Sequence, residues 1–201
     1  CISTPLLAAF PDGELLAFAE ARWVSPCLDN SPKSIVMRRS TDGLGAHWGP
    51  MQYIVNDSRT NLRLDGLNLG SVTVINASSL CIHYVFCAHT CPQSSSMLLL
   101  STDRGATFEN SNITQMTNAG GRQFVPGPGS GIVLSKSSRL VIPGYFHIGT
   151  MFSGTEYGSM VLLSDDGGRT FRPGGVIRPR NSTGTGCTYL EPNEAAVVEL
   201  P

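Results

Sequence analysis

The stretch Ser101-Thr-Asp-Arg-Gly-Ala-Thr-Phe108 decides the fold, because its pattern returns along the chain. Ser164-Asp-Asp-Gly-Gly-Arg-Thr-Phe171 has the same pattern, Ser-x-Asp-x-Gly-x-Thr-Phe, and Ser40-Thr-Asp-Gly-Leu-Gly-Ala-His-Trp48 has a related form with one extra residue. The three copies start 61 and 63 residues apart, a spacing that suits a four-stranded propeller blade with its loops. Each copy therefore indicates one blade of a β-propeller.

The chemistry of this repeat is that of a turn. An Asp side chain accepts hydrogen bonds from backbone N–H groups, Gly adopts a positive φ, and the aromatic residue packs beneath the turn. No stretch shows a helical period, and no linker divides residues 1–201, so the sequence predicts a single all-β domain. Strands are expected beside the turns, at Leu15 to Ala19, Ile35 to Arg39, Met97 to Ser101, Leu140 to Pro143 and Met160 to Ser164.

Composition excludes several classes of partner. The 201 residues can bury one core, with 41% hydrophobic residues, 14% charged residues and a formal net charge of −1. Lys and Arg form no basic stripe, so nucleic acid is not an expected partner. No apolar run approaches the roughly 20 residues that span a bilayer. The chain starts at Cys1 without the charged and apolar regions of a signal peptide, so we expect that any targeting peptide has been removed or was never included.

Cysteines and glycosylation tripeptides point to an oxidising compartment. Six cysteines allow 15 pairings, among which the sequence does not choose. Four tripeptides satisfy the N-glycosylation rule, beginning at Asn56, Asn76, Asn112 and Asn181. Together these features favour a secretory route.

Several longer strings resemble the animal lysosomal sialidases, from about Pro5 to Pro201. The repeated turns resemble the Asp-box of that family. The more specific strings are Leu15-Leu-Ala-Phe-Ala-Glu-Ala-Arg22, Arg38-Arg-Ser40, Ile54-Val-Asn-Asp57, Asp65-Gly-Leu-Asn-Leu-Gly70, Val125-Pro-Gly-Pro-Gly-Ser-Gly-Ile132 and Leu162-Leu-Ser-Asp-Asp166. The resemblance implies a six-bladed propeller, of which this chain supplies roughly three blades.

The resemblance also implies an activity and a setting. Members of the family remove terminal sialic acids from glycoproteins, glycolipids and oligosaccharides with retention, and need no cofactor or metal. A Tyr is the nucleophile, a Glu takes its proton, an Asp is the general acid and base, and three Arg residues clamp the substrate carboxylate. A lysosomal or secretory location follows, with membrane-associated and extracellular locations as alternatives, and a lysosomal carboxypeptidase as a partner.

Two acidic residues match the catalytic pattern of the family. Asp29 follows Ala19-Glu-Ala-Arg22 by a short loop, where the resemblance implies the acid/base Asp; a turn-forming loop residue is the alternative. Glu194 falls where the family has the Glu partner of the nucleophile, and we prefer it to Glu191 and Glu199. Ala195 and Ala196 follow it where the lysosomal enzymes have Cys and Gln, which indicates a weakened site.

Four further residues match the walls of the family's pocket. Arg22 corresponds to an Arg beside the sialic acid, and Asn68 to the opposite wall. Tyr145 and His147 correspond to the side of the pocket that faces the glycerol group. The alternatives are a strand-end charge for Arg22, a turn residue for Asn68, and strand-end packing for Tyr145 and His147.

The chain also departs from the family. Ser3 stands where the resemblance implies the first Arg of the clamp, and the other two Arg residues and the Tyr nucleophile are expected beyond Pro201. Three blades of six would leave unpaired strand edges. The alternatives are therefore a non-catalytic propeller module that binds glycan or protein, or an incorrectly assembled gene product.

Three other chemistries fit the sequence poorly. Cys87-Ala-His-Thr-Cys91, with His83 nearby, contains zinc-ligand residue types but has no clear fourth ligand. The glycines of Pro126-Gly-Pro-Gly-Ser-Gly131 are followed by neither a Lys-Ser/Thr pair nor a helix, so a phosphate-binding loop is not expected. The sequence contains no Gly-x-Ser-x-Gly elbow between a strand and a helix, so it does not indicate a Ser-His-Asp hydrolase.

Overall fold

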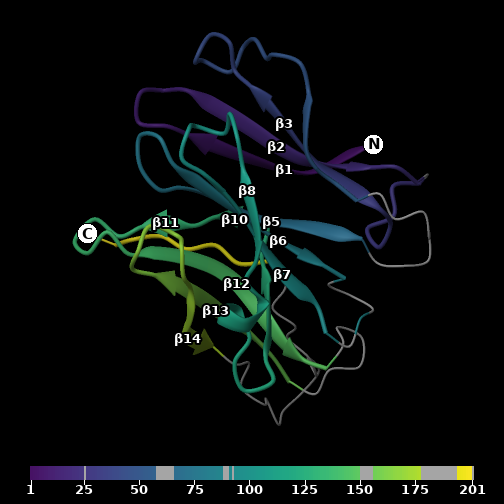
Figure 1. Cartoon of the computed structure of the whole chain (residues 1–201), viewed down its shortest axis with the longest axis vertical. Helices are drawn as coiled ribbons and strands as arrows, with labels where there is room; N and C mark the ends of the chain where they lie inside the picture. The colour runs from purple at the N-terminus through teal and green to yellow at the C-terminus, as the bar shows by residue number, and fades with distance from the viewer. Residues whose placement is uncertain are drawn as a thin grey trace, which may run out of the picture.

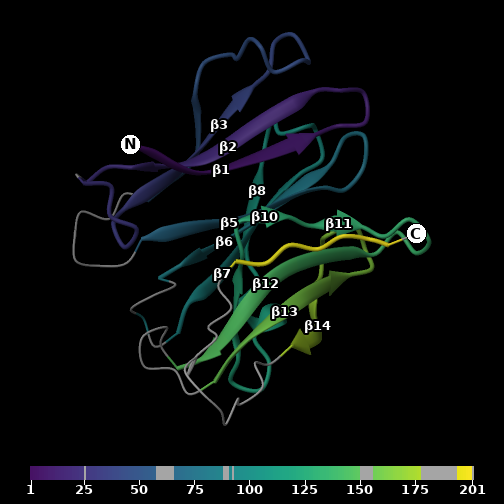
Figure 2. The same cartoon turned by 180° about the vertical axis from the view of Figure 1, so that it is seen from behind.

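The computed structural model describes residues 1–24, 26–57, 66–87, 91, 93–149, 156–177 and 194–200. Its strands form three sheets that follow one another down the molecule (Figure 1), and the view from behind shows the same order (Figure 2). The first sheet has the order β1-β2-β3-β4, with antiparallel neighbours throughout. Its strands are β1 (Ile2–Ala9), β2 (Leu15–Arg22), β3 (Lys33–Arg39) and β4 (Gln52–Asn56).

The second sheet is a meander with one added parallel strand. Its order is β10-β5-β6-β7-β8, in which β10 returns from later in the chain to pair with β5. Its strands are β5 (Leu67–Val74), β6 (Leu80–Phe86), β7 (Ser95–Ser101), β8 (Glu109–Asn112) and β10 (Gly129–Ser130).

The third sheet has the order β11-β12-β13-β14, and β9 pairs with β12 off this path. Its strands are β9 (Gln123–Pro126), β11 (Ile132–Val133), β12 (Leu140–Ile148), β13 (Glu156–Ser164) and β14 (Arg172–Ile177). One helical turn, α1 (Thr114–Thr117), lies between β8 and β9. The all-β prediction is confirmed, and so are the five predicted strands, each of which is longer in the structure than the sequence indicated.

Two apolar cores join the sheets because alternate strand residues face the neighbouring sheet. Leu16, Phe18 and Ile35 of the first sheet belong to one cluster with Leu69 and Tyr84 of the second. A second cluster joins the second and third sheets, with members Cys81, Leu98, Leu140, Ile142, Phe146 and Leu162. The described sheets do not close into a ring. Several large apolar side chains of the first sheet and its loops remain exposed, namely Ile2, Leu7, Trp23 and Tyr53.

The three repeated segments form turns at the outer hairpin of each sheet, between β3 and β4, β7 and β8, and β13 and β14. In the second turn the Ser101 hydroxyl donates to Asp103 over 2.8 Å, and Asp103 accepts the Thr107 N–H over 2.9 Å. The Thr107 hydroxyl and N–H and the Ser101 hydroxyl hold the pKa of Asp103 down to about 2. Gly105 has φ +76°, and a Cβ there would lie 3.0 Å from Leu16. The turn therefore carries the hydrogen-bond chemistry expected from the sequence.

Two disulfides occur among the described residues, Cys1–Cys27 and Cys87–Cys91, while Cys81 is a buried thiol. Cys187 lies outside the described residues. No helix in the described ranges is long and apolar enough to cross a membrane.

Candidate functional site

A cavity of about 590 Å³ receives side chains from all three sheets. Five of the six candidate residues line it, although they come from distant parts of the sequence: Arg22, Asp29, Asn68, Tyr145 and Glu194. Side chains of β2, β5 and β12 therefore meet the loop after β2 and the segment 194–200 at one place. The geometry brings these residues together and leaves their chemical roles as predictions.

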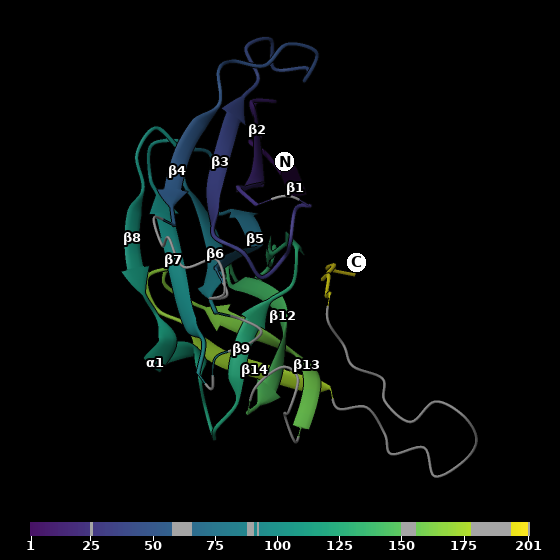
Figure 3. The same ribbon diagram turned by 90° about the vertical axis from the view of Figure 1, so that its right-hand side faces the viewer.

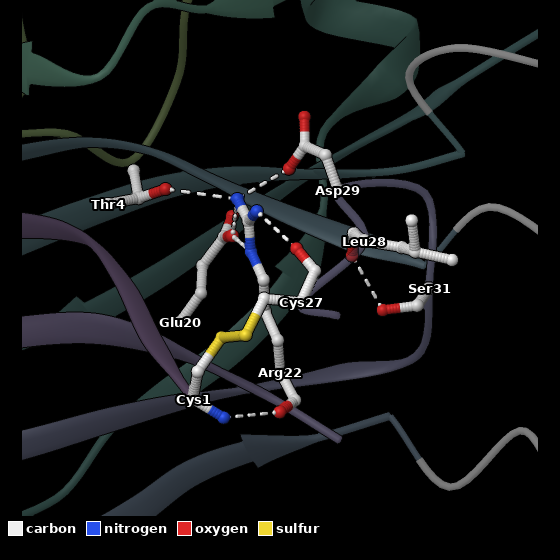
Figure 4. The surroundings of a disulfide bond; sticks show 8 residues. All are labelled: Cys1, Thr4, Glu20, Arg22, Cys27, Leu28, Asp29 and Ser31. Atoms are coloured by element: carbon white, nitrogen blue, oxygen red, sulfur yellow. Dashed lines mark hydrogen bonds and ion pairs between the residues drawn. A yellow bond between two sulfur atoms is a disulfide. The ribbon is translucent and has the colours of Figure 1, made fainter. Parts of the chain in front are cut away.

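Arg22 and Asp29 form the charged wall of the cavity. Arg22 Nη2 lies 2.5 Å from Asp29 Oδ1, and Arg22 Nη1 donates to the Cys27 carbonyl over 3.1 Å. The Arg22 side chain is 12% exposed and that of Asp29 is 54% exposed. Within the loop, the Ser31 hydroxyl donates to the Leu28 carbonyl over 2.7 Å. Figure 4 shows Arg22 at the centre of these contacts, with the Cys1–Cys27 disulfide beside it.

Two buried charges that sequence reasoning missed support this wall. Glu20 is 1% exposed, and its Oε2 accepts Arg22 Nε over 2.9 Å and Nη2 over 2.8 Å. Its Oε1 accepts the Leu69 N–H of the second sheet over 2.8 Å. Lys33 is 0% exposed, with Nζ 3.2 Å from Asp29 Oδ1 and 3.5 Å from Glu20 Oε2. Two sequence features could have indicated these buried charges. They are the alternation Ala-Glu-Ala-Arg and the four-residue spacing from Asp29 to Lys33.

Strand geometry explains why these charges converge. Glu20 and Arg22 are two apart on β2, so they project from the same face of the sheet. Arg22 pairs with Lys33 across the β2–β3 ladder, and Glu20 pairs with Ser3 across the β1–β2 ladder. A register irregularity between Ser3 and Leu6 lies at the same end of the sheet. The Arg22 guanidinium also reaches the Thr4 hydroxyl, with Nη2 3.5 Å from Oγ1.

The opposite side of the cavity is less charged. Asn68 is half-buried on β5, and its Oδ1 has no hydrogen-bond partner among the described residues. Tyr145 is 4% exposed and packs with Val85 and Val125. Its buried aromatic side chain therefore lines the cavity from the third sheet.

Glu194 is exposed at the start of the segment 194–200, which lies beside the third sheet (Figure 3). A Cβ on Gly127 would lie 2.7 Å from the Ala195 nitrogen, so Gly127 permits this close approach. Glu199 is placed elsewhere, because its carboxylate accepts the Ser135 N–H over 2.9 Å. Glu191 lies outside the described residues. Among the described Glu candidates for this role, Glu194 is the one that lines the cavity.

His147 does not line the cavity. It is fully buried, with Nδ1 2.8 Å from the Gly149 carbonyl oxygen, and its ring lies at a tilt to Tyr157. This position matches the alternative of strand-end packing. Tyr145 and His147 are two residues apart on a strand, so they project from the same face. The alternation of the strand therefore could not tell which of the two side chains reaches the cavity.

The residues of the considered zinc site are occupied otherwise. Cys87 and Cys91 are joined to each other, and His89 lies outside the described residues. His83 is buried with its ring edge-on to Phe171 at 4.7 Å between ring centres. No group of three or more His, Cys, Asp or Glu side chains within the described ranges is arranged to hold a metal ion.

Comparison with known proteins identifies the family. The sequence profile of the BNR repeat-like domain matches residues 5–197. The chain belongs to the BNR repeat-like domain family.

Solved structures show the same fold for this BNR repeat-like chain. A Hadza microbial sialidase superposes with a TM-score of 0.72 at 21% identity, over 88% of this chain and 38% of that one. A mutant Trypanosoma rangeli sialidase displaying trans-sialidase activity gives 0.70 at 20% identity, over 88% and 31%. The intramolecular trans-sialidase from Ruminococcus gnavus, in complex with oseltamivir carboxylate, gives 0.67 at 14% identity, over 92% and 61%.

These similarities establish an all-β fold like that of the sialidase propeller. The BNR repeat-like chain spans less than two thirds of the length of each of these three proteins.

Proposed function

We propose that this chain is part of a sialidase-type glycoside hydrolase, an exo-α-sialidase that releases terminal sialic acids with retention. The observation that carries the proposal is the convergence of Arg22, Asp29, Asn68, Tyr145 and Glu194 on one cavity. These residues were selected from their match to sialidase motifs, and their meeting at one place supports a common site. The substrates would be sialylated glycoproteins, glycolipids and oligosaccharides.

Asp29 suits the role of general acid and base. Its carboxyl group is half-exposed at the cavity, so it can reach both a bound glycoside and water. It would donate a proton to the leaving aglycone oxygen and later take a proton from the water that releases the sugar. Glu194 would accept the proton of the Tyr nucleophile, which the resemblance places outside these 201 residues. Arg22 and Asn68 would shape the walls around the sugar.

The decisive experiment is release of a fluorescent aglycone from an α-sialoside at about pH 4.5 to about pH 7. In a protein that contains this chain together with the Tyr nucleophile, we expect turnover and a loss of about 100-fold or more in Asp29→Asn, the range for removal of a general acid. Asp165→Asn is the matched control, because Asp165 is 51% exposed and pairs with Arg139 away from the cavity. Absence of turnover in a folded protein that holds both this chain and the nucleophile would contradict the proposal.

A non-catalytic glycan-binding module is the second candidate. Ser3 lines the cavity where the family pattern has an Arg. Of the charged side chains described in the cavity lining, Glu20, Asp29 and Glu194 are acidic and Arg22 is basic, and Arg22 is bonded to two of those acids. Calorimetric titration with a methyl α-sialoside tests this candidate: binding without turnover would favour the module.

The cellular setting is a further part of the proposal. The resemblance supports a lysosomal or secretory location and a lysosomal carboxypeptidase as partner. The two disulfides agree with an oxidising compartment. Co-purification of the chain with such a carboxypeptidase from a secretory host would support the partner, and separate elution of the two would contradict it.

A further inference from the structure

Lys33 occupies an unusual place for a lysine. Its side chain is 0% exposed, and its backbone carbonyl accepts the Asp57 N–H over 3.0 Å. The backbone of Lys33 is thus fixed at the start of β3, while its ammonium group lies among the charges behind the cavity. Lysine is almost never fully buried unless it is paired.

The partners of Lys33 define what it does. Glu20 is already engaged by Arg22 and by the Leu69 N–H, and lies 3.5 Å from Lys33 Nζ. Asp29 is closer, with Oδ1 3.2 Å from Nζ. A buried ammonium without a partner would be costly. The contact with Asp29 therefore stabilises Lys33 and links β3 to the loop that carries Asp29.

Two cationic side chains from neighbouring strands form ion pairs with the same carboxylate oxygen of Asp29. Arg22 reaches Oδ1 from β2 over 2.5 Å, and Lys33 reaches it from β3 over 3.2 Å. In Figure 4 the second carboxylate oxygen of Asp29 points away from Arg22. Because both cations stand on ladder-paired residues, the orientation of the carboxylate is set by the sheet.

We propose that Lys33 is a positioning residue for Asp29, holding the carboxylate of the loop in its orientation at the cavity. This inference rests on the proposed role of Asp29 in glycoside hydrolysis. Lys33 does not line the cavity, so we do not expect it to touch a substrate there. It acts through Asp29, and Glu20 balances its charge from the other side.

Lysine labelling tests the placement without any need for turnover. The chain has two lysines, Lys33 and the exposed Lys136, which serves as an internal control. With an amine-reactive ester and mass spectrometry, we expect Lys33 to react slower than Lys136 by about tenfold or more, because buried side chains react through local opening. Asp29→Asn should accelerate labelling of Lys33 and leave Lys136 unchanged. Equal protection of Lys33 in Asp29→Asn would overturn the proposal.

Kinetics test the effect on the reaction. In Lys33→Met of a protein that contains this chain and the Tyr nucleophile, we expect kcat to fall about tenfold or more with KM nearly unchanged, because positioning acts on the chemical step. Lys33→Arg should restore part of kcat, and Lys136→Met should change neither constant. A folded Lys33→Met with unchanged kcat would overturn the proposal. If Lys33→Met does not fold, Lys33→Arg and the labelling of Asp29→Asn still decide.

The two experiments separate the inference from the proposed function. A wild-type protein that holds the nucleophile and shows no turnover would count against the sialidase proposal alone. The labelling result would still show whether the ion pair with Asp29 keeps Lys33 buried.

Discussion

At the scale of single residues, His83 makes the strongest prediction about pH. It is 1% exposed, and neither ring nitrogen has a hydrogen-bond partner among the described residues. Burial lowers its pKa from 6.5 to about 3. Below about pH 6.5 the unfolded chain therefore binds a proton at His83 that the folded chain does not bind. The contribution of His83 to the free energy of unfolding is complete above about pH 6.5 and is lost as pH falls toward 3.

The prediction is a loss of roughly 2 to 3 kcal/mol in unfolding free energy between about pH 7 and about pH 4.5, at about 1.4 kcal/mol per unit. Urea denaturation at both pH values measures it. His83→Leu should flatten this pH dependence, because it removes the buried imidazole. An unchanged slope in His83→Leu would contradict the assignment. The result matters for the proposed lysosomal location, because an acidic compartment would weaken this fold.

Motif and spacing led the sequence to residues that share one cavity, and the roles of these residues stay predictions. Arg22 and Asn68 lie in strings specific to the resembled family, and both reach the cavity. Lys33 and Glu20 were missed because charged residues usually belong to the surface. Their burial depends on one another and on the Leu69 N–H of the next sheet. A contact between two sheets cannot be predicted from a local sequence pattern.

At the scale of elements, the repeated turns depend on their first serine. The Ser101 hydroxyl accepts the buried Gly105 N–H over 2.7 Å, and the Ser164 hydroxyl accepts that of Gly168 over 2.9 Å. We expect Ser101→Ala and Ser164→Ala each to cost roughly 1 to 3 kcal/mol, because each leaves a buried donor unsatisfied. Urea denaturation measures the loss. Exposed Ser137→Ala is the control, and a loss in Ser101→Ala no larger than in this control would contradict the role of the serine.

Five of the strands, namely β2, β3, β7, β12 and β13, were predicted from the sequence, and their ends were predicted less well. The apolar pattern located β2, and the structure extends it through Glu20 to Arg22, because these charges find partners within the sheet. The two-residue strands β10 and β11 were not foreseen. β10 pairs in parallel with β5, and such pairing over a long sequence separation depends on tertiary packing. The single turn α1 is likewise too short for a helical period to appear.

At the scale of the whole molecule, the three sheets are joined in series. One apolar cluster joins the first sheet to the second, and another joins the second to the third. In such an arrangement each unit is stabilised mainly by its neighbours. A change at one junction should therefore loosen the sheets beside it and leave the far sheet protected.

Arg104 offers the test of this arrangement, because it lies in the turn between β7 and β8 and reaches the first sheet. Its Nη1 donates to Asp12 over 2.7 Å, lowering the pKa of Asp12, and its guanidinium stacks over Phe10 at 5.3 Å. We predict that Arg104→Met accelerates amide hydrogen exchange in β1 and β2 while β12 and β13 keep their rates. Arg169→Met is the matched control, since Arg169 bonds within its own turn. Uniform acceleration across all three sheets would show instead that they unfold as one cooperative unit.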